Sequence, residues 1–193
     1  MTLDEALEQA RNKLDRSFEL MNGLEGKGDL LDKLVASYVL LAMEHHHAMI
    51  ILIENHRRIS VAALVRPQFE AIVRGTWLAF KGDGVIASEI GAGLHKWKGI
   101  RKMCTQIDTF IEGKTFTEIV DTNIDALHSY THGGTHMLSR CMNDNDIISS
   151  FTDNEMIEIL SATSVNMLMM ILAFAVKADH EYLKKGIRAE IVG

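Results

Sequence analysis

The sequence Val165-Asn166-Met167-Leu168-Met169-Met170-Ile171-Leu172 would be apolar on nearly every side of a helix. Thr152 or Asp153 can cap this helix, which we expect to run to about Lys185. A helix without a polar face is buried on most sides. A membrane span needs about 20 apolar residues. The run over residues 165–176 is shorter and contains Asn166, so we expect a buried helix and no membrane association.

Residues 29–55 predict a second long helix, with apolar side chains on most of its surface. Its expected core stripe consists of Leu31, Leu34, Val35, Tyr38, Leu41, His45, Met49 and Leu52. A small monomer has little room to hide two such helices completely. The two segments together therefore predict a homodimer.

Other helices are predicted over residues 3–22, 61–80 and 85–111, and from about residue 116 into a histidine-rich segment. Pro67 indicates either a kink or a new helix start, and we favour the kink. Gly91, Gly93 and Gly99 predict close helix packing, and Gly133-Gly134 should break the helix that contains the histidines. We expect one all-α domain over residues 1–193, a mainly antiparallel bundle of five to six helices.

Composition agrees with this fold class and limits the function. The chain has one proline, 11 methionines and 6% aromatic residues, and it shows no sustained apolar–polar alternation that would predict strands. The net charge of −6 argues against a general phosphate-binding surface but allows a local basic pocket. The N-terminal residues do not resemble a signal peptide, and the two cysteines fit no zinc or disulfide pattern, so we expect a cytoplasmic protein.

Arg66, Glu70 and Arg74 are spaced four residues apart, and Trp77 continues the same helix face. Such a ladder is usually a set of weak exposed ion pairs. The surrounding sequence is apolar, however, and partly buried charges must pair with one another or with a ligand. The ladder is therefore either structural or part of a functional polar pocket.

His128, His132 and His136 lie in the most chemically dense segment of the chain, together with Tyr130 and Arg140. Two histidines four residues apart on a helix can hold a metal ion, and histidine is also a common acid–base group. Because Gly133-Gly134 should interrupt the helix, we expect the third histidine to point elsewhere. Metal binding, ligand contact and ordinary hydrogen bonding all remain open for this segment.

Glu44 and His47 show the E-x-x-H spacing of carboxylate-bridged di-metal bundles, although the sequence contains only this one copy. Glu70, His128 and His132 could complete an unusual divalent-metal site with them. The alternative is that His45 packs in the core and its neighbours face polar groups.

Two short blocks resemble known families. They are Arg66-Pro67-Gln68-Phe69-Glu70 with Arg74-Gly75-Thr76-Trp77, and Ser129-Tyr130-Thr131-His132-Gly133-Gly134 with Arg140. They are similar to the bacterial helical families of unknown function DUF6988 and DUF5677, which pair an R-x-x-x-E helix with a later Y-x-H-x-G segment. In outline the chain also resembles HEPN domains, which occur in toxin–antitoxin and phage-defence systems and often act as dimeric RNases. The usual HEPN signature, an arginine followed four to six residues later by histidine, does not occur in this sequence.

The leading hypothesis is a bacterial HEPN-like protein without a cofactor, whose pocket binds an anionic small molecule or RNA. Glu70 would orient the arginines, and His132 with Tyr130 would act as the acid–base pair. The ligand-binding residues would be Arg66, Arg74, Trp77, His128, His136 and Arg140. Two alternatives stay open: a metal-dependent enzyme using the Glu44, His47, Glu70, His128 and His132 set, and a non-catalytic interaction or antitoxin-like module. The second alternative predicts that Arg66, Glu70 and His132 lie far apart.

Overall fold

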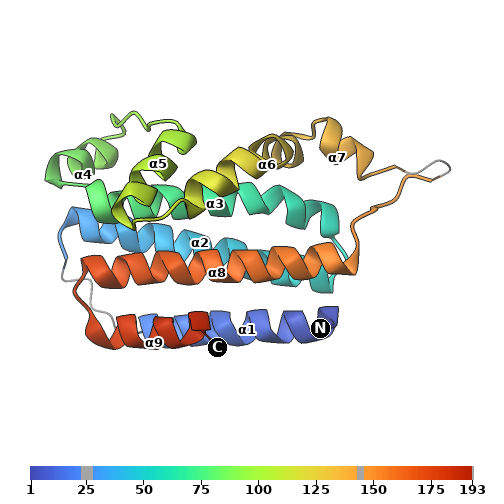
Figure 1. Cartoon of the computed structure of the whole chain (residues 1–193), viewed down its shortest axis with the longest axis horizontal. Helices are drawn as coiled ribbons and strands as arrows, with labels where there is room; N and C mark the ends of the chain where they lie inside the picture. The colour runs from blue at the N-terminus through green and yellow to red at the C-terminus, as the bar shows by residue number, and fades with distance from the viewer. Residues whose placement is uncertain (23–27, 143–145, 193) are drawn as a thin grey trace.

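Three long helices, α2 (Leu30–Glu54), α3 (Arg58–Lys81) and α8 (Asp153–Lys177), pack against one another at the centre of the molecule. The structure is a computed structural model that describes residues 1–22, 28–142 and 146–192. Figure 1 shows α1 (Leu3–Met21) and α9 (Glu181–Val192) on one side of this centre. On the other side lie α4 (Gly84–Gly91), α5 (Ile100–Phe110), α6 (Thr115–His132) and α7 (Thr135–Ser139). No strand occurs among the described residues, so the predicted all-α bundle is confirmed.

The apolar surfaces of α2 and α8 follow from their central position. Each packs on several helices, and buried residues such as Val35, Met49, Met167 and Ile171 join one continuous core. Both helices are long and apolar enough to cross a membrane by length and composition alone, which is weak support for a membrane protein because core helices pass the same test. In this structure 39% of the apolar window of α2 and 50% of that of α8 are buried, and apolar residues such as Leu40 and Ile51 of α2 remain exposed.

Local sequence signals explain several helix ends. Thr2 and Glu5 form a capping box at the start of α1, and Thr152 and Glu155 form another at the start of α8. At the end of α6, Gly133 adopts a φ of 66°, in the left-handed region that closes helices and favours glycine. The predicted break at the glycine pair is therefore correct.

Other expected boundaries were wrong. The helix predicted over residues 85–111 is two helices, because Ala92 ends α4 and Gly93, with a φ of 71°, turns the chain away. Gly91 and Gly93 thus lie at the end of α4 and Gly99 at the start of α5, and none of the three marks close packing inside a helix. The last predicted helix also divides, at Asp179 with a φ of 50°. In contrast, α3 continues through Pro67, so no new helix starts there.

Helix directions are mixed. Helices that follow one another through short connections, such as α2 and α3, run antiparallel, as expected (Figure 1). However, α3 and α8 also pack together, and Figure 1 shows them running in the same direction. More than 70 residues separate the two helices, which is enough chain to return to the starting end of the bundle.

Candidate functional site

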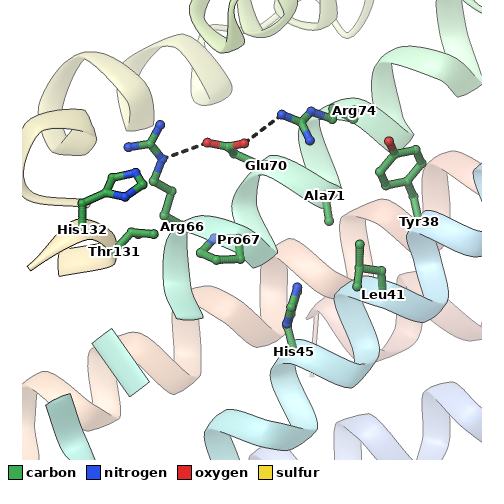
Figure 2. Close-up of a pocket in the computed structure, with 10 residues that line it drawn as sticks. All are labelled: Tyr38, Leu41, His45, Arg66, Pro67, Glu70, Ala71, Arg74, Thr131 and His132. Atoms are coloured by element: carbon green, nitrogen blue, oxygen red, sulfur yellow. Dashed lines mark hydrogen bonds and ion pairs between the residues drawn. The ribbon is translucent and has the colours of Figure 1, made fainter. Parts of the chain in front are cut away.

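A pocket of about 460 Å³ opens where the end of α6 passes over α3, with α2 forming another wall (Figure 2). Its volume is in the range of small-molecule sites. Its lining residues are Tyr38, Leu41 and His45 of α2, Arg66, Pro67, Glu70, Ala71 and Arg74 of α3, and Thr131 and His132 of α6. The structure thus brings the charged ladder and one histidine of the distant segment to a single pocket.

Glu70 holds both arginines of the ladder. Arg66 Nε donates to Glu70 Oε1 over 2.8 Å, and Arg74 Nη2 donates to Glu70 Oε2 over 2.9 Å. The side chains of Glu70 and Arg66 are only 21% and 19% exposed, so these are not freely solvated surface pairs. Two cations share one carboxylate, which leaves one net positive charge beside the pocket.

His132 brings an imidazole to one end of the pocket, and His128, which does not line the pocket, contacts both His132 and Arg66. An arginine guanidinium can only donate hydrogen bonds, so His128 Nδ1 accepts the bond from Arg66 Nη1. The rings of His128 and His132 lie one helical turn apart, with their centroids 4.5 Å from each other. Figure 2 shows the His132 ring beside the Arg66 guanidinium. His132 is exposed, so it stands at the mouth of the pocket.

The wall formed by α2 adds two uncharged polar groups. Burial raises the pKa of Tyr38, and the nearby Arg74 guanidinium opposes that rise. Burial lowers the pKa of His45, against the opposing charge of Glu44. Tyr38 and His45 are therefore neutral at pH 7. The guanidinium of Arg74 also lies 5.5 Å from the centre of the Trp97 ring, which fixes its position.

His45 and His46 exchange the roles expected from the sequence. We predicted His45 in the core, but it is only half-buried and lines the pocket. His46 is fully buried and has hydroxyl partners on both ring nitrogens, Thr163 Oγ1 and Ser164 Oγ, each at 3.1 Å. His46 is thus the core histidine. The prediction failed because the apolar stripe of α2 is broad, and either residue fits it.

Five of the expected site residues do not line this pocket: Trp77, His128, Tyr130, His136 and Arg140. Trp77 is buried, and its Nε1 donates to Gln106 Oε1 over 2.7 Å. The Tyr130 ring packs edge-on against the ring of Phe151, with the centroids 5.7 Å apart. His136 is exposed on the short helix α7. Tyr130 lines a different cavity and does not share this pocket with His132, although only one residue lies between them in the sequence.

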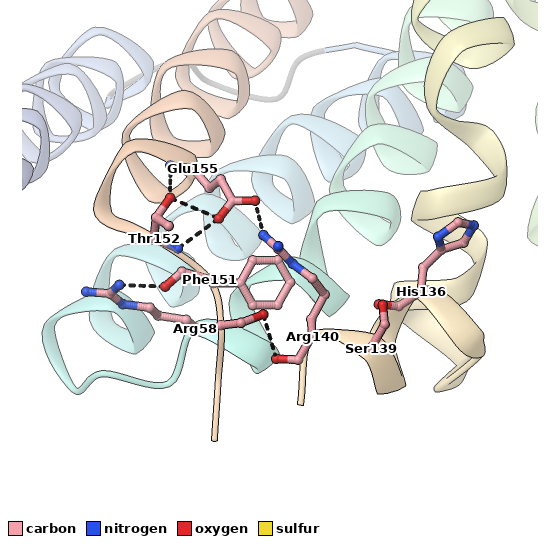
Figure 3. A network of polar contacts seen from close by, with 8 residues as sticks. Arg58, His136, Ser139, Arg140, Phe151, Thr152 and Glu155 are labelled. Carbon is pink, nitrogen blue, oxygen red and sulfur yellow. Dashed lines mark hydrogen bonds and ion pairs between the residues drawn. The ribbon is translucent and has the colours of Figure 1, made fainter. Parts of the chain in front are cut away.

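Arg140 belongs to a different polar network, at the start of α8 (Figure 3). Its guanidinium pairs with Glu155 and lies over the ring of Phe151, 4.5 Å from the ring centre. Glu155 also accepts a 2.8 Å hydrogen bond from the backbone of Thr152. Arg140 thus contacts residues at the start of α8, none of which lines the pocket.

The alternative metal site requires convergence of Glu44 and His47 with Glu70 and the histidine pair. Glu44 and His47 are exposed on α2 and do not line the pocket. Across residues 1–22, 28–142 and 146–192, no three His, Cys, Asp or Glu side chains come close enough together to hold a metal ion.

Sequence reasoning did not assign Tyr38, His45 and Thr131 to the site. A signal for two of them was present. Tyr38 and His45 are seven residues apart on one stripe of α2, and two polar groups on an otherwise apolar stripe require a polar neighbour. Thr131 offered no such signal, because its hydroxyl donates within its own helix to the Leu127 carbonyl oxygen over 2.9 Å.

The chain was compared with known families, curated proteins and solved structures. A model of DUF6988, a family of unknown function, matches residues 39–190. The chain belongs to DUF6988. The matched region of this DUF6988 member includes all the pocket-lining residues of α3 and α6, and Leu41 and His45 of α2. No curated protein and no solved structure matches the chain. The resemblance to DUF5677 and to HEPN domains stays a prediction.

Proposed function

We propose that this DUF6988 member binds an anionic, phosphate-bearing ligand, such as a nucleotide or an RNA end, in the pocket between α2, α3 and α6. One observation carries the proposal: two arginines anchored on one carboxylate share a single pocket with His132. Planar guanidinium groups suit phosphate oxygens because they offer several donors in a fixed arrangement.

Arg66 and Arg74 have more hydrogen-bond donors than their partners in the protein use. Glu70 uses Arg66 Nε and Arg74 Nη2, and His128 uses Arg66 Nη1. The Nε of Arg74 is buried without an acceptor among the described residues, so it is not a donor that a ligand can reach. Each guanidinium has five N–H donors, and the bonds to Glu70 and His128 use only some of those of Arg66 and Arg74, so an anion in the pocket would supply acceptors for the others.

His132 has the position required of an acid–base group. It stands at the pocket mouth, next to the arginine that would hold the phosphate. Imidazole exchanges protons readily near neutral pH, so a bound phosphoester would meet a proton donor and acceptor. Tyr130 has no part in this scheme because it lines a different cavity.

The first experiment is a calorimetric titration with inorganic phosphate, nucleoside monophosphates and a short single-stranded RNA. We expect binding by the wild type and roughly 10- to 100-fold weaker binding by Arg66→Ala, which removes charge-assisted hydrogen bonds to phosphate. The matched control is Arg101→Ala, which removes an exposed arginine paired with Asp121 on the neighbouring helix. An equal loss of affinity in both variants would indicate a general electrostatic effect of the protein's charge and contradict a specific site. If the wild type bound none of the probes, the proposal would be refuted.

The two alternatives make different predictions. A metal-dependent enzyme should retain divalent metal after purification without a tag, which elemental analysis measures. A pure interaction module predicted a wide separation of Arg66, Glu70 and His132, whereas these side chains line one pocket. We therefore favour the anion-binding protein, and we extend the proposal to a HEPN-like, cytoplasmic protein of toxin or phage-defence systems in bacteria.

A further inference from the structure

A second and larger cavity of about 730 Å³ forms a groove along the bundle. Its floor is α3 and its two walls are α6 and α8, which have little packing with each other. Val65 and Phe69 of α3 line this groove, whereas Arg66 and Glu70 line the polar pocket. The two cavities therefore lie on different faces of α3, and the proposed anion site does not account for the groove.

The groove is lined by apolar residues with some polar ones, and it is open to solvent. Ile119 and Ala126 on α6 face Ala162 and Val165 on α8, and Val165 is 40% exposed. These residues recur at the spacing of one helix face, and polar side chains, among them Asn123 on α6 and Glu158 on α8, lie between them in the lining. Open apolar surface rimmed by polar residues marks an interaction site, and a groove between two helices fits an apolar segment of a partner.

The same chain carries an exposed apolar arm beside this groove. We call residues 141–142 and 146–149, between α7 and α8, the arm; they lead away from the body of the bundle (Figure 1). Ile147 is 88% exposed, Ile148 is 53% exposed and Met142 is 56% exposed. Three large apolar side chains in one short projecting segment are costly to leave in water.

Several hydrogen bonds hold the base of the arm, Arg140 on one side and Ser150 and Phe151 on the other, which we call the neck (Figure 3). Ser150 N donates to the Arg140 carbonyl oxygen over 2.9 Å and closes the neck. Arg58 Nη1 donates to the Phe151 carbonyl oxygen over 2.7 Å, and Arg140 is paired with Glu155. These contacts fix the direction of the arm, which projects away from the bundle and from its own groove.

We infer that the occupant of the groove is the arm of a second copy of this chain, in a two-fold dimer with reciprocal exchange of arms. Phe151 ends the neck of the arm and also lines the groove, so the base of the arm and the groove adjoin. A two-fold axis at this place sets each arm over the partner's groove. Both unsatisfied apolar surfaces are then covered, and each contact occurs twice.

The dimer uses a surface other than the one that the sequence indicated. The sequence predicted a homodimer from the apolar character of residues 29–55 and 152–185. The structure buries one face of each of these helices in the core, whereas Leu40 and Ile51 of α2 stay 54% and 45% exposed. The groove and the arm are smaller features, and the sequence carries no clear signal for either of them.

The test is sedimentation velocity at micromolar concentrations on the full chain. We expect the wild type to be a dimer, and both an arm variant, Ile147→Asp with Ile148→Asp, and a groove variant, Ala162→Arg, to dissociate roughly a hundredfold more readily. The matched control is Leu94→Asp, which places a charge at another exposed apolar residue, 73% exposed and outside both surfaces. We expect this control to dimerise like the wild type. Circular dichroism should show unchanged helix content in all three variants.

Mixing the two variants provides the decisive part of the test. The arm variant keeps an intact groove and the groove variant keeps an intact arm, so a mixture should recover dimers with one arm–groove contact. Three results would each overturn the inference: a monomeric wild type, arm and groove variants that dimerise as tightly as the wild type, or two monomeric variants that fail to associate when mixed.

Discussion

Acidification should destabilise the protein through His46, the fully buried histidine of α2. Thr163 Oγ1 donates its proton to the Ile159 carbonyl oxygen over 2.6 Å, so it accepts from His46 Nδ1. Ser164 Oγ then donates to His46 Nε2. The ring is neutral in this arrangement, and a second ring proton would meet the hydroxyl proton of Ser164. Burial accordingly lowers the pKa of His46 from 6.5 to about 4, assisted by the neighbouring His47.

The sign of the effect follows from this lowered pKa. Between pH 6.5 and about 4 the unfolded chain binds a proton at His46 that the folded chain does not bind, so unfolding becomes easier as the pH falls. The stabilisation that the folded state gains from keeping His46 neutral is complete above pH 6.5 and is lost as the pH falls through 4. At 1.36 kcal/mol per pH unit, the lowered pKa amounts to about 3 kcal/mol of unfolding free energy. That is a large part of the 5–15 kcal/mol typical of a domain.

Urea unfolding at a series of pH values between 7.5 and 4 measures this contribution. The comparison is with His46→Gln, which keeps a donor and an acceptor but cannot titrate in this range. The variant should be less stable at pH 7, and the difference from the wild type should shrink by about 3 kcal/mol on going to pH 4. A difference that stays constant across the series would refute the expectation that His46 is held neutral by burial.

Two further predictions concern packing and thiol chemistry. Gly75→Ala should lower the unfolding free energy by about 1–3 kcal/mol, because an added Cβ would lie 2.6 Å from Tyr38 Cβ and 2.8 Å from Met170 Sδ. Gly84→Ala is the matched control, since nothing lies within 4 Å of its added Cβ, and equal urea midpoints for the two variants would contradict the prediction. Burial, together with the charge of Asp108, raises the pKa of Cys104 to about 12, so at pH 8 this thiol should react with a disulfide reagent only after unfolding. Rapid labelling of Cys104 in the native protein would show that the thiol is accessible.

The sequence predicted helices well where apolar periodicity and caps agree. Thr152 and Gly133 each marked a helix end correctly, because capping depends on neighbouring residues alone. The prediction failed over residues 85–111, where residues 92–99 connect two separate helices. Close helix packing was expected at Gly91 and its neighbours, but it occurs at Gly75, where α2, α3 and α8 meet. Such a meeting point depends on long-range contacts.

The site could be predicted only in part, for a similar reason. The ladder from Arg66 to Arg74 is a local pattern, and its apolar surroundings indicated partial burial correctly. Tyr130 and His132 were equivalent candidates in the sequence. Side chains at positions i and i+2 of a helix point about 200° apart, however, and these two residues face different cavities. Which of the two faces the ladder depends on how α6 rotates against α3, and that is a property of the packed core.

The most direct test of the anion site is a nuclear magnetic resonance titration that observes arginine Nε–H groups while a nucleoside monophosphate is added. The Arg66 and Arg74 signals are assigned by their loss in Arg66→Lys and Arg74→Lys. We expect these two signals to shift together and saturate, while the signal of the exposed Arg101 does not move. Saturable shifts at other arginines, with Arg66 and Arg74 unchanged, would contradict an anion site in this pocket.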